Sequence, residues 1–496
     1  MANTRVHIPQ DVSAVACGAD AVAEDFAAAG LDVVRTGSRG ATWAEPMVEM
    51  ADDTGSRTAW RNVTADDVPE VLKQGNAHPK CLGAVDAIDW LAGQHRVVFD
   101  RCGTDHPLAL PPTVALESRL DAAPTALIDE IETSGLRGRG GAGFPAHIKW
   151  RTVRDTPAEQ KYLVCNADEG DSGTFADRLL LEGDPFRLIE GMAIAAIATG
   201  ATRGFVYLRS EYPDAERTFA AALKRAYEHG MLGNSVLGSA HTFDLELFVG
   251  AGAYICGEET SLLESLEGRR GEIRAKPPVP AIAGLFGQPT VVHNVISYAA
   301  VPGIMQGGGS AYAELGVAPS TGTMAFQLAG NVLRGGLIEV PFGITLAEIV
   351  EGYGGGTRSG RPLRAVQIGG PLGAYLGQED LDTPLTYEAM ANIGAGIGHG
   401  GIVVFDDTVD LAEQAHYAFK FCEVESCGKC TPCRLGSVRG KETIQTILDG
   451  RAGPRELTMI RDLCEVMESA SLCQMGGMTP IPVLSAMERF PEDFKR

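Results

Sequence analysis

The sequence predicts a multidomain α/β protein that ends in a bundle of helices. Its 496 residues are too many for one hydrophobic core, so three or four domains are expected. Predicted helices and strands alternate from about residue 116 to 300, which favours a parallel or mixed sheet covered by helices on both faces. After Val409 the pattern becomes helical.

The N-terminal part is predicted to be a small α/β unit. Strands are expected at VHIP and LDVVRTG, with a helix over 11–29 between them, and TAWRNVTADDVPEVL predicts a strand followed by a helix. Residues 75–115, which contain two proline-rich points at His78-Pro79 and Pro111-Pro112, predict an irregular connector.

The central part alternates regularly. Helices are predicted over 124–133, 185–199 and 214–229, and strands over 162–167, 204–209 and 243–250. Residues 322–376 differ, because short β-like runs surround one helical segment, ITLAEIVEGY, and they indicate a small α+β insert. Three helices follow, in LAEQAHYAFKFCEVE, KETIQTILDG and RELTMIRDLCEVMESASL.

Charge and hydropathy exclude two classes of partner. The net charge of −22 argues against nucleic acid, which is bound through Lys and Arg side chains. The longest strongly apolar run, 191–201, is too short to span a bilayer. The first residues, MANTRVHIPQDVS, have no secretory signal, so a cytoplasmic location without a membrane span is expected.

The cysteines are clustered. Cys427, Cys430 and Cys433 are separated by two residues each, and Cys473 follows forty positions later. Two-residue gaps let three thiolates surround one inorganic centre, and a remote fourth closes the site, which is typical of a [4Fe–4S] cluster. Structural zinc and buried apolar cysteines remain alternatives. Cys422 and Cys464 are expected to be core residues instead.

A glycine-rich loop, GLRGRGGAGFP (135–145), follows a predicted helix. Glycines allow φ > 0 and let main-chain N–H groups approach a ligand, while Arg137, Arg139 and Lys149 add charge suited to a phosphate. The spacing is not that of the Rossmann fingerprint, and a plain turn is the competing interpretation.

Two acidic segments follow predicted strands. They are NADEGD (166–171) and GAGAYICGEET (250–260), placed where α/β proteins bind ligands. Carboxylates suit the hydroxyls and the amide of a dinucleotide. For Glu258 and Glu259 the competing interpretation is stabilisation of a helix N-terminus without any ligand.

Four motifs in this order resemble one family. GLRGRGGAGFP, NADEGDSGTFADR, GAYICGEETSLLESLEG and ESCGKCTPCR are similar to those of the flavoprotein subunit of respiratory complex I and its relatives in NAD-dependent formate dehydrogenases and NAD-reducing hydrogenases. The similarity covers about residues 115 to 490. It implies an NAD(H)-dependent oxidoreductase (diaphorase) subunit with one FMN, an NAD(H) site and one [4Fe–4S] cluster.

The resemblance also implies the site residues. Those expected around FMN are Gly138, Arg139, Gly140, Gly141, Ala142, Gly143, Lys149, Asn166, Asp168, Gly257, Glu258 and Asn294. Those expected near the dinucleotide are Phe144, Glu169, Asp171, Tyr254, Glu259 and Lys276. The cluster ligands would be Cys427, Cys430, Cys433 and Cys473, and no side chain is expected to act as a catalytic acid, base or nucleophile.

The family resemblance divides the chain into five parts. It implies a thioredoxin-like module (1–72), a linker (73–115), an FMN/NAD(H)-binding domain (116–320), a β-grasp-like domain (321–405) and a helical [4Fe–4S] domain (406–496). The thioredoxin-like module of such enzymes holds a [2Fe–2S] cluster, but Ser38 and Thr42 stand where two of its thiolates should be. Hydroxyls do not replace thiolates there, so a module without a cluster is predicted.

That degenerate module and GGPLGAY (369–375) resemble most closely the β subunit of a soluble NAD-dependent formate dehydrogenase. Electrons would pass between the cluster, FMN and NAD⁺ by hydride transfer at the flavin. The expected partners are a ferredoxin-like [2Fe–2S] subunit and a catalytic iron–sulfur subunit, molybdenum-dependent for formate, in a hetero-oligomer. Alternatives are a complex I or NAD-reducing hydrogenase flavoprotein, or a subunit that no longer binds NAD.

Overall fold

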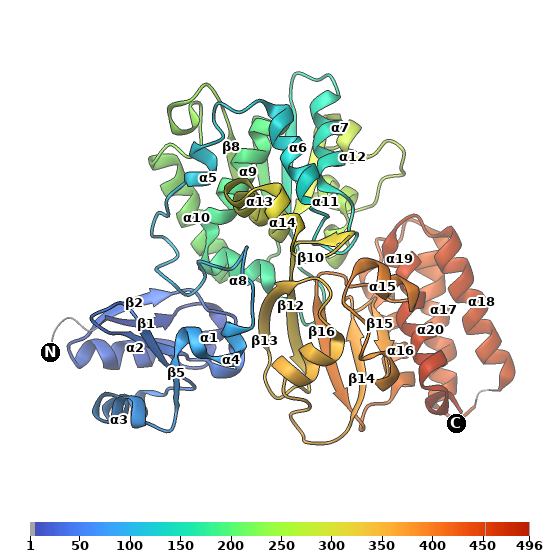
Figure 1. Ribbon diagram of the computed structural model, residues 1–496. Helices are drawn as coiled ribbons and strands as arrows, with labels where there is room; N and C mark the ends of the chain where they lie inside the picture. The colour runs from blue at the N-terminus through green and yellow to red at the C-terminus, as the bar shows by residue number, and fades with distance from the viewer. Residues whose placement is uncertain (1–4, 452, 496) are drawn as a thin grey trace.

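The computed structural model describes residues 5–451 and 453–495, so the ends of the first and last predicted domains at 1–4 and 496 lie outside the described part. It contains three larger sheets, of five, four and five strands, followed by a C-terminal group of helices (Figure 1). The predicted multidomain α/β architecture is confirmed at this level.

The N-terminal sheet has the strand order β2-β1-β3-β4-β5. Its strands are β1 (Arg5–Pro9), β2 (Asp32–Thr36), β3 (Val48–Ala51), β4 (Arg57–Trp60) and β5 (Cys81–Ala84). Only β1 and β2 are parallel, joined by α1 (Val12–Ala16) and α2 (Ala19–Ala28). The helix predicted over 11–29 is therefore two helices, separated at Gly18, whose φ is 97°.

This first sheet extends further than the sequence predicts. Strand β5 pairs with β4 beyond position 72, within the stretch predicted to be a linker. Its residues, CLGA, show no alternation of apolar and polar side chains, so periodicity does not reveal the strand.

The central sheet is fully parallel and has the order β8-β7-β6-β9. Its strands are β6 (Tyr162–Ala167), β7 (Arg203–Leu208), β8 (Asp244–Val249) and β9 (Thr290–Asn294). The first three match the predicted strands. The sequence does not predict β9, because its apolar run is only two residues long, Val291 and Val292, before His293 and Asn294.

Helices pack against the central sheet, among them α7 (Ala146–Asp155), α9 (Pro185–Thr199), α10 (Pro213–Glu228) and α13 (Val295–Gly307), and α6 (Pro124–Ser134) packs on α7, α9 and α13. Every residue of α9 is buried, which explains its continuous apolar sequence. Gly191 lets α9 approach α13 closely, because a β-carbon there would collide with the carbonyl oxygen of Tyr298.

The third sheet has the order β13-β12-β16-β14-β15. Its strands are β12 (Thr323–Gly330), β13 (Gly336–Pro341), β14 (Leu363–Ile368), β15 (Ala374–Leu376) and β16 (Gly401–Asp406). The segment ITLAEIVEGY, predicted to be helical, forms a π-helix over Glu348–Tyr353. This sheet lies between the N-terminal module and the C-terminal helices (Figure 1).

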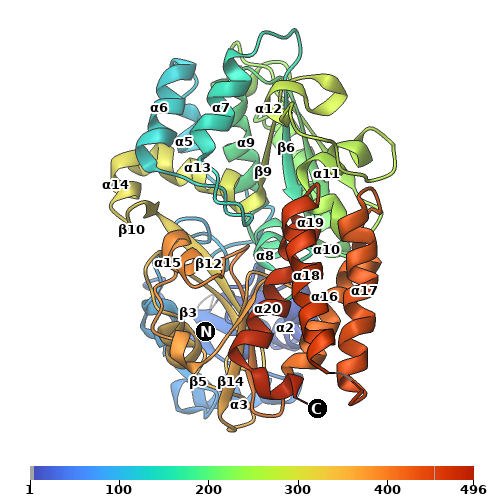
Figure 2. The same ribbon diagram turned by 90° about the vertical axis from the view of Figure 1, so that its right-hand side faces the viewer.

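The C-terminal helices form a bundle beside the third sheet and below α11 (Glu259–Leu266) (Figure 2). They are α16 (Leu411–Glu425), α17 (Thr431–Leu448), α18 (Pro454–Ala470), α19 (Gln474–Met478) and α20 (Pro480–Arg489). The predicted helix KETIQTILDG is the second half of α17.

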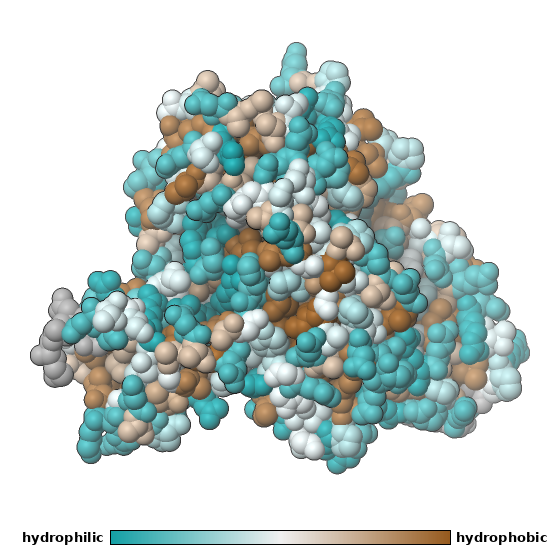
Figure 3. Space-filling model, viewed as in Figure 1, coloured by the Kyte–Doolittle hydropathy of each residue, from teal (hydrophilic) through white to brown (hydrophobic). Residues whose placement is uncertain are grey.

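The surface is mostly polar, and apolar residues show at the centre of one face, where the upper and lower parts of the molecule meet (Figure 3). Among the described residues, no helix combines the length and the apolar character that crossing a bilayer requires.

Candidate functional site: a glycine loop, acidic strand ends and four cysteines

The segments predicted to bind a cofactor lie at one edge of the central parallel sheet. Asp168 follows β6, the 250–257 turn follows β8, and Asn294 is the last residue of β9. The carboxyl ends of parallel strands share one edge of a sheet, where α/β proteins bind ligands. The tertiary structure therefore brings Asp168 and Asn294, which are 126 positions apart (294 − 168 = 126), to the same edge of the sheet.

The glycine loop folds back on itself between α6 and α7. Gly138 donates its N–H to the carbonyl oxygen of Phe144 at 2.8 Å, and Arg137 bridges to Pro145. Gly141 and Gly143 have φ values of 117° and 59°, which disfavour other residues. A β-carbon on Gly140 would lie 2.8 Å from Cβ of Asn294, so only glycine allows this close approach to the end of β9.

Asn166 joins two of the strand ends. Its Nδ2 donates to the carbonyl oxygen of Gly257 at 2.7 Å, and its Oδ1 accepts from the N–H of Asp168 at 3.1 Å. A β-carbon on Gly257 would lie 3.2 Å from Oδ2 of Asp168. Burial raises the pKa of Asp168 to about 7. This carboxyl group is therefore poised to accept or donate a hydrogen bond near neutral pH.

Glu258 and Glu259 open α11 and meet two lysines. Oε2 of Glu258 accepts hydrogen bonds from the N–H groups of Thr260 and Ser261. This oxygen therefore caps the N-terminus of α11, as the competing interpretation expects. Its Oε1 lies 3.0 Å from Nζ of Lys276. The second carboxylate, Glu259, contacts both Lys276 at 2.7 Å and Lys149 at 3.2 Å.

The contacts with Lys149 and Lys276 determine the charge state of Glu259. Burial raises the pKa of Glu259, but Lys149 and Lys276 together hold it below its usual value. Lys149 also donates to the carbonyl oxygen of Val292 in β9 at 3.1 Å. The predicted residues Lys149, Glu258, Glu259 and Lys276 thus form one ionic group that links α7, α11 and the sheet.

Arg139 differs from the expectation. Its guanidinium is buried and donates to the carbonyl oxygens of Arg137, Thr321 and Thr323 and to the hydroxyl of Tyr312. The expectation that this side chain provides charge for a phosphate is therefore corrected, because all three guanidinium nitrogens donate to protein acceptors in the core.

The acidic loop after β6 also differs in part from the expectation. Glu169 is buried, and its two oxygens accept from the N–H groups of Asp177 and Arg178, which caps α8 (Ala176–Gly183). Its side chain is therefore directed into the protein. Asp171 accepts from the hydroxyl of Tyr254 at 2.8 Å, so these two predicted residues do lie together.

The tip of the glycine loop carries an exposed aromatic residue. Phe144, predicted to stack on the dinucleotide, keeps 44% of its surface exposed, although a large aromatic side chain is usually buried. Ala142 lies beside it in the same loop. An exposed aromatic ring at the rim of the site is available to contact a planar ligand.

Three of the four predicted cysteine ligands lie at the N-terminal ends of two helices, and Cys427 lies in the loop between α16 and α17. Cys430 is the residue that precedes α17, Cys433 lies in its first turn, and Cys473 precedes α19. A β-carbon on Gly476 of α19 would lie 2.7 Å from Cβ of Cys433, which shows how closely the two helix ends approach. Helix N-termini stabilise negative charge, as thiolates bound to iron require.

The environment of these sulfurs suits a cationic centre. Burial raises the pKa of Cys473 to about 11, so without a cation its thiol would stay protonated. Cys433 is buried in the hydrophobic cluster of the helical bundle, and Cys427, Cys430 and Cys473 pack against the same cluster, so the four predicted ligands share one apolar surrounding. Cys464 and Cys422 are fully buried as predicted, and Sγ of Cys422 lies 3.6 Å from Sγ of Cys433.

The cysteine site and the strand-end site are joined. Lys429 donates to the carbonyl oxygen of Ile273 at 2.7 Å, and Arg270 donates to that of Cys427 at 3.1 Å. Glu425 accepts from the N–H of Tyr254 at 3.1 Å. The loop that carries the cysteines therefore packs directly on the segment after α11.

In the N-terminal module, the hydroxyls at the degenerate positions have protein partners. Ser38 donates to Oε1 of Glu45 at 2.6 Å and accepts from the N–H of Gly40, and Thr42 donates to the carbonyl oxygen of Gly335. The bond from Thr42 attaches the module to the turn that precedes β13.

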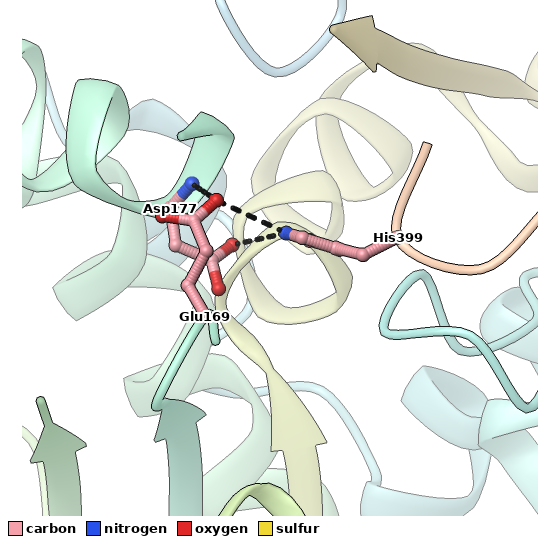
Figure 4. Close-up of side chains that lie close together, drawn as sticks. All are labelled: Glu169, Asp177 and His399. Carbon is pink, nitrogen blue, oxygen red and sulfur yellow. Dashed lines mark hydrogen bonds and ion pairs between the residues drawn. The ribbon is translucent and has the colours of Figure 1, made fainter. Parts of the chain in front are cut away.

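Two residues at the site escape the sequence prediction. Asp177 and His399 lie against Glu169 and are both buried (Figure 4). Asp177 lies within the NADEGDSGTFADR motif, and the hint for His399 was the composition of GAGIGHGG (394–401), where a histidine interrupts closely spaced glycines.

Comparisons with known proteins agree with this geometry. The Nuo51 FMN-binding domain matches residues 131–303, and the iron–sulfur binding region of NADH-ubiquinone oxidoreductase-F matches residues 413–496. The chain is 43% identical over 408 residues to the HndC component of the NADP-reducing hydrogenase of Solidesulfovibrio fructosivorans, covering 81% of this chain and 83% of that one.

Two further relatives extend the match. The chain is 40% identical over 384 residues to a component of the NADH-quinone oxidoreductase of Aquifex aeolicus, covering 77% of this chain and 88% of that one. The structure of an NAD⁺-reducing [NiFe]-hydrogenase in its H₂-reduced state has a TM-score of 0.74 and 31% identity, covering 100% of this chain and 85% of that one. The chain therefore belongs to the family of NADH-binding flavoproteins of the NADH-quinone oxidoreductases, which have an FMN-binding domain and a [4Fe–4S]-binding region.

Proposed function

We propose that the chain is the diaphorase subunit of a soluble, cytoplasmic NAD-dependent formate dehydrogenase. FMN exchanges a hydride with NAD(H) and single electrons with an iron–sulfur cluster, which is why this family carries both. The observation that carries the proposal is the direct contact between the cysteine loop and the segment after α11, through Lys429, Arg270 and Glu425. This contact gives a short path between the two sites.

The chain's own residues bind and orient in this scheme. The main chain of the glycine loop, with Asn166, Asp168, Gly257 and Asn294, is proposed to hold FMN. Phe144 and the ionic group of Glu258, Glu259, Lys149 and Lys276 would place the dinucleotide, and Tyr254 would position Asp171. Cys427, Cys430, Cys433 and Cys473 would hold the cluster, in the helical part proposed for 406–496.

Two features support the choice of formate dehydrogenase. The N-terminal module lacks two of the thiolates expected at its cluster site, and Ser38 and Thr42 are instead engaged in hydrogen bonds. The GGPLGAY segment lies on the acidic loop, because a β-carbon on Gly370 would lie 2.5 Å from Cγ of Asp171. The proposed partners are a ferredoxin-like [2Fe–2S] subunit and a molybdenum-dependent catalytic subunit.

A second candidate is the flavoprotein of an NAD-reducing hydrogenase. The observation that favours it is the similarity of the whole chain, N-terminal module included, to a chain of the NAD⁺-reducing [NiFe]-hydrogenase. The two candidates share the flavin and cluster chemistry and differ only in the partner that delivers electrons.

One experiment tests the shared part. Anaerobic titration of the purified chain with NADH should bleach the flavin absorbance and produce the EPR signal of one reduced [4Fe–4S] cluster. A flavin that NADH does not bleach would support a subunit that no longer binds NAD and would refute the diaphorase proposal. An additional [2Fe–2S] signal would show that Ser38 and Thr42 do not prevent cluster binding.

A second experiment separates the candidates. The complex isolated through an affinity tag on this chain should contain molybdenum and reduce NAD⁺ with formate. Nickel in the complex and NAD⁺ reduction with H₂ would instead assign the chain to a hydrogenase. NADH oxidation with a quinone, and neither metal, would assign it to a complex I.

A further inference from the structure

A buried histidine stands between two carboxylates beside the proposed flavin site (Figure 4). Nε2 of His399 lies 3.2 Å from Oδ1 of Asp177 and 3.3 Å from Oε1 of Glu169. The side chains of His399, Asp177 and Glu169 are exposed by only 6%, 1% and 0%. His399 precedes β16 of the third sheet, whereas the carboxylates belong to the loop after β6 and to α8.

The other ring nitrogen determines the protonation of this histidine. Nδ1 lies 2.8 Å from the carbonyl oxygen of Arg139, which can only accept, so Nδ1 carries a proton. In the neutral ring, Nε2 would then present a lone pair to two carboxylates, which is repulsive. Burial lowers the pKa of His399, but Asp177 and Glu169 raise it well above its usual value. The ring is therefore an imidazolium.

The imidazolium is connected to both sides of the glycine loop. On one side it donates directly to Arg139 within the loop. On the other, Asp177 accepts from Nδ2 of Asn294 at 2.7 Å, and Asn294 is the residue against which Gly140 packs. The neighbouring Gly398 also contacts the loop, since its Cα would lie 3.7 Å from a β-carbon on Gly141.

The acidic loop depends on the same contacts. Glu169 has a φ of 29°, in the left-handed region that non-glycine residues disfavour by about 1 kcal/mol or more. The contacts that hold it are those of its carboxylate with α8 and His399, and that of its carbonyl oxygen with Arg209. This conformation sets the directions of Asp168 and Asp171 on either side.

We propose that His399 is a positioning residue for the FMN-binding site: its single positive charge offsets one of the two negative charges of Glu169 and Asp177, and its contacts hold the glycine loop, the acidic loop and Asn294 in one arrangement. The inference rests on the proposed FMN site and goes beyond it, because position 399 lies outside the FMN-binding match at 131–303. His399, which precedes β16 of the third sheet, thus completes a proposed FMN site that is built on the central sheet.

Other charged or titratable groups surround the triad on every element packed against it. They are Cys165 in β6, Asp171 in the acidic loop, Arg178 and Glu182 in α8, Arg209 and Tyr212 after β7, and Arg139 in the glycine loop. None of their side chains replaces the imidazolium, because Arg139 is bonded to the core, Arg178 to the hydroxyl of Ser13, and Arg209 to Glu169's carbonyl oxygen and Glu211.

The test is the affinity of the deflavinated full chain for FMN, followed by quenching of flavin fluorescence at pH 6 and pH 8.5. The wild type provides the reference affinity at each pH, which includes any effect of Asp168, whose pKa of about 7 lies between the two values. His399→Gln leaves two buried carboxylates without a counter-charge, so its affinity should fall about tenfold at pH 8.5. At pH 6 it should recover, because repulsion raises the carboxylate pKa values and one group takes up a proton.

A double variant tests whether the loss of affinity in His399→Gln is caused by the uncompensated negative charge. His399→Gln combined with Asp177→Asn removes one negative charge and should restore most of the affinity at pH 8.5. His7→Gln is the matched control, because His7 is also buried but lies in the N-terminal sheet, where burial lowers its pKa to about 4. It should bind FMN like the wild type. Circular dichroism and iron content confirm folding of each variant.

Three results would overturn the inference. An equal loss of affinity at both pH values, without rescue by Asp177→Asn, would mean that His399 only fills space. A stoichiometric divalent metal in the wild type that His399→Gln loses would mean that the triad binds a cation instead. Failure of both His399 variants to fold would show that the imidazole shape, not its charge, is required. A wild-type chain that binds no FMN would refute the proposed function itself.

Discussion

Arg139 lies in the middle of a loop whose composition suggests phosphate binding, yet its guanidinium enters the core. It donates to three carbonyl oxygens and to one tyrosine hydroxyl, and Phe342 packs on its face with 4.8 Å between the guanidinium carbon and the ring centroid. The side chain therefore fastens the glycine loop to β12 and to the turn before it. A basic residue next to glycines is not by itself evidence for a ligand.

Arg139→Met should lower the free energy of unfolding by about 2–4 kcal/mol, because four buried acceptors lose their donor. The measurement is the denaturation midpoint of the full chain in guanidinium chloride. Arg151→Met serves as the control, since Arg151 forms its ion pairs with Asp129 and Glu132 at the surface, and its denaturation midpoint should stay close to that of the wild type. Equal losses for the two variants would contradict the anchoring role.

The cysteine side chains allow a second test at the scale of single residues. Cys433→Ser should abolish the [4Fe–4S] EPR signal and most of the bound iron, because a hydroxyl does not replace a thiolate ligand. Cys422→Ser should keep both, although its sulfur lies only 3.6 Å from that of Cys433. Loss of iron in Cys422→Ser instead would make Cys422 a ligand and remove one of the four proposed residues from the set.

At the scale of elements, the segments with strong apolar patterns were the most predictable. The strands β6, β7 and β8 and the helices α9, α10 and α18 have such patterns and were found where expected. Strands β3, β5, β9, β15 and β16 were not predicted, whereas β1, β2 and β4, which have four or five residues each, were, so length alone does not explain the difference. The positions of the strands that were not predicted depend on pairing with other strands of the sheets.

The junction between the N-terminal sheet and α8 carries buried carboxyl groups. Burial, together with Asp11, raises the pKa of Glu45 to about 8, and burial raises that of Glu182 to about 7. A carboxyl group whose pKa is higher in the folded state contributes most stability at low pH. For Glu45, that contribution declines as the pH rises from the pKa of the carboxyl group in the unfolded chain, near 4.5, to its pKa in the folded protein, near 8.

Glu45→Gln should therefore match the wild type near pH 5 and exceed its stability at pH 8.5 by about 1–3 kcal/mol. Thermal unfolding at a series of pH values measures the difference. The control is Glu24→Gln, at an exposed position on α2, which should have the same stability as the wild type at every pH. If Glu45→Gln is instead less stable at pH 8.5, its hydrogen bonds with Ser38 and Met47 favour the charged form more than burial opposes it.

At the scale of the whole molecule, the connector after the N-terminal module binds the third sheet. Glu339 in β13 is buried and accepts from the N–H groups of Val98 and Phe99 and from the hydroxyl of Thr323. One carboxylate therefore satisfies donors from the connector and from β12 at once. The segment predicted to be an irregular linker is in fact held in place by tertiary contacts.

Glu339→Ala should destabilise the protein by about 3 kcal/mol, because three buried donors are left without an acceptor, and Glu339→Gln should cost less. Limited proteolysis should then cut faster within residues 95–115, while urea denaturation measures the loss. Glu351→Ala, at an exposed position, is the control for both measurements and should behave like the wild type. Unchanged proteolysis in Glu339→Ala would show that other contacts hold the connector.

The amino-acid sequence by itself determined the class of the protein, the four cysteines and the segments that surround the cofactor site. These features depend on local spacing: two-residue gaps between cysteines, closely spaced glycines, and acidic residues directly after apolar strands. The sequence also indicated that Cys464 is a core residue, because its neighbours repeat at helical spacing.

Only the tertiary structure decided which side chains face the site. The period of a strand or helix does not reveal that Arg139 and Glu169 turn inward, or that His399 reaches Glu169 across 230 positions (399 − 169 = 230). The contact between the cysteine loop and Ile273 is equally non-local. Such contacts arise from how the sheets and the helical bundle pack together, and packing joins residues whose separation along the chain carries no local pattern.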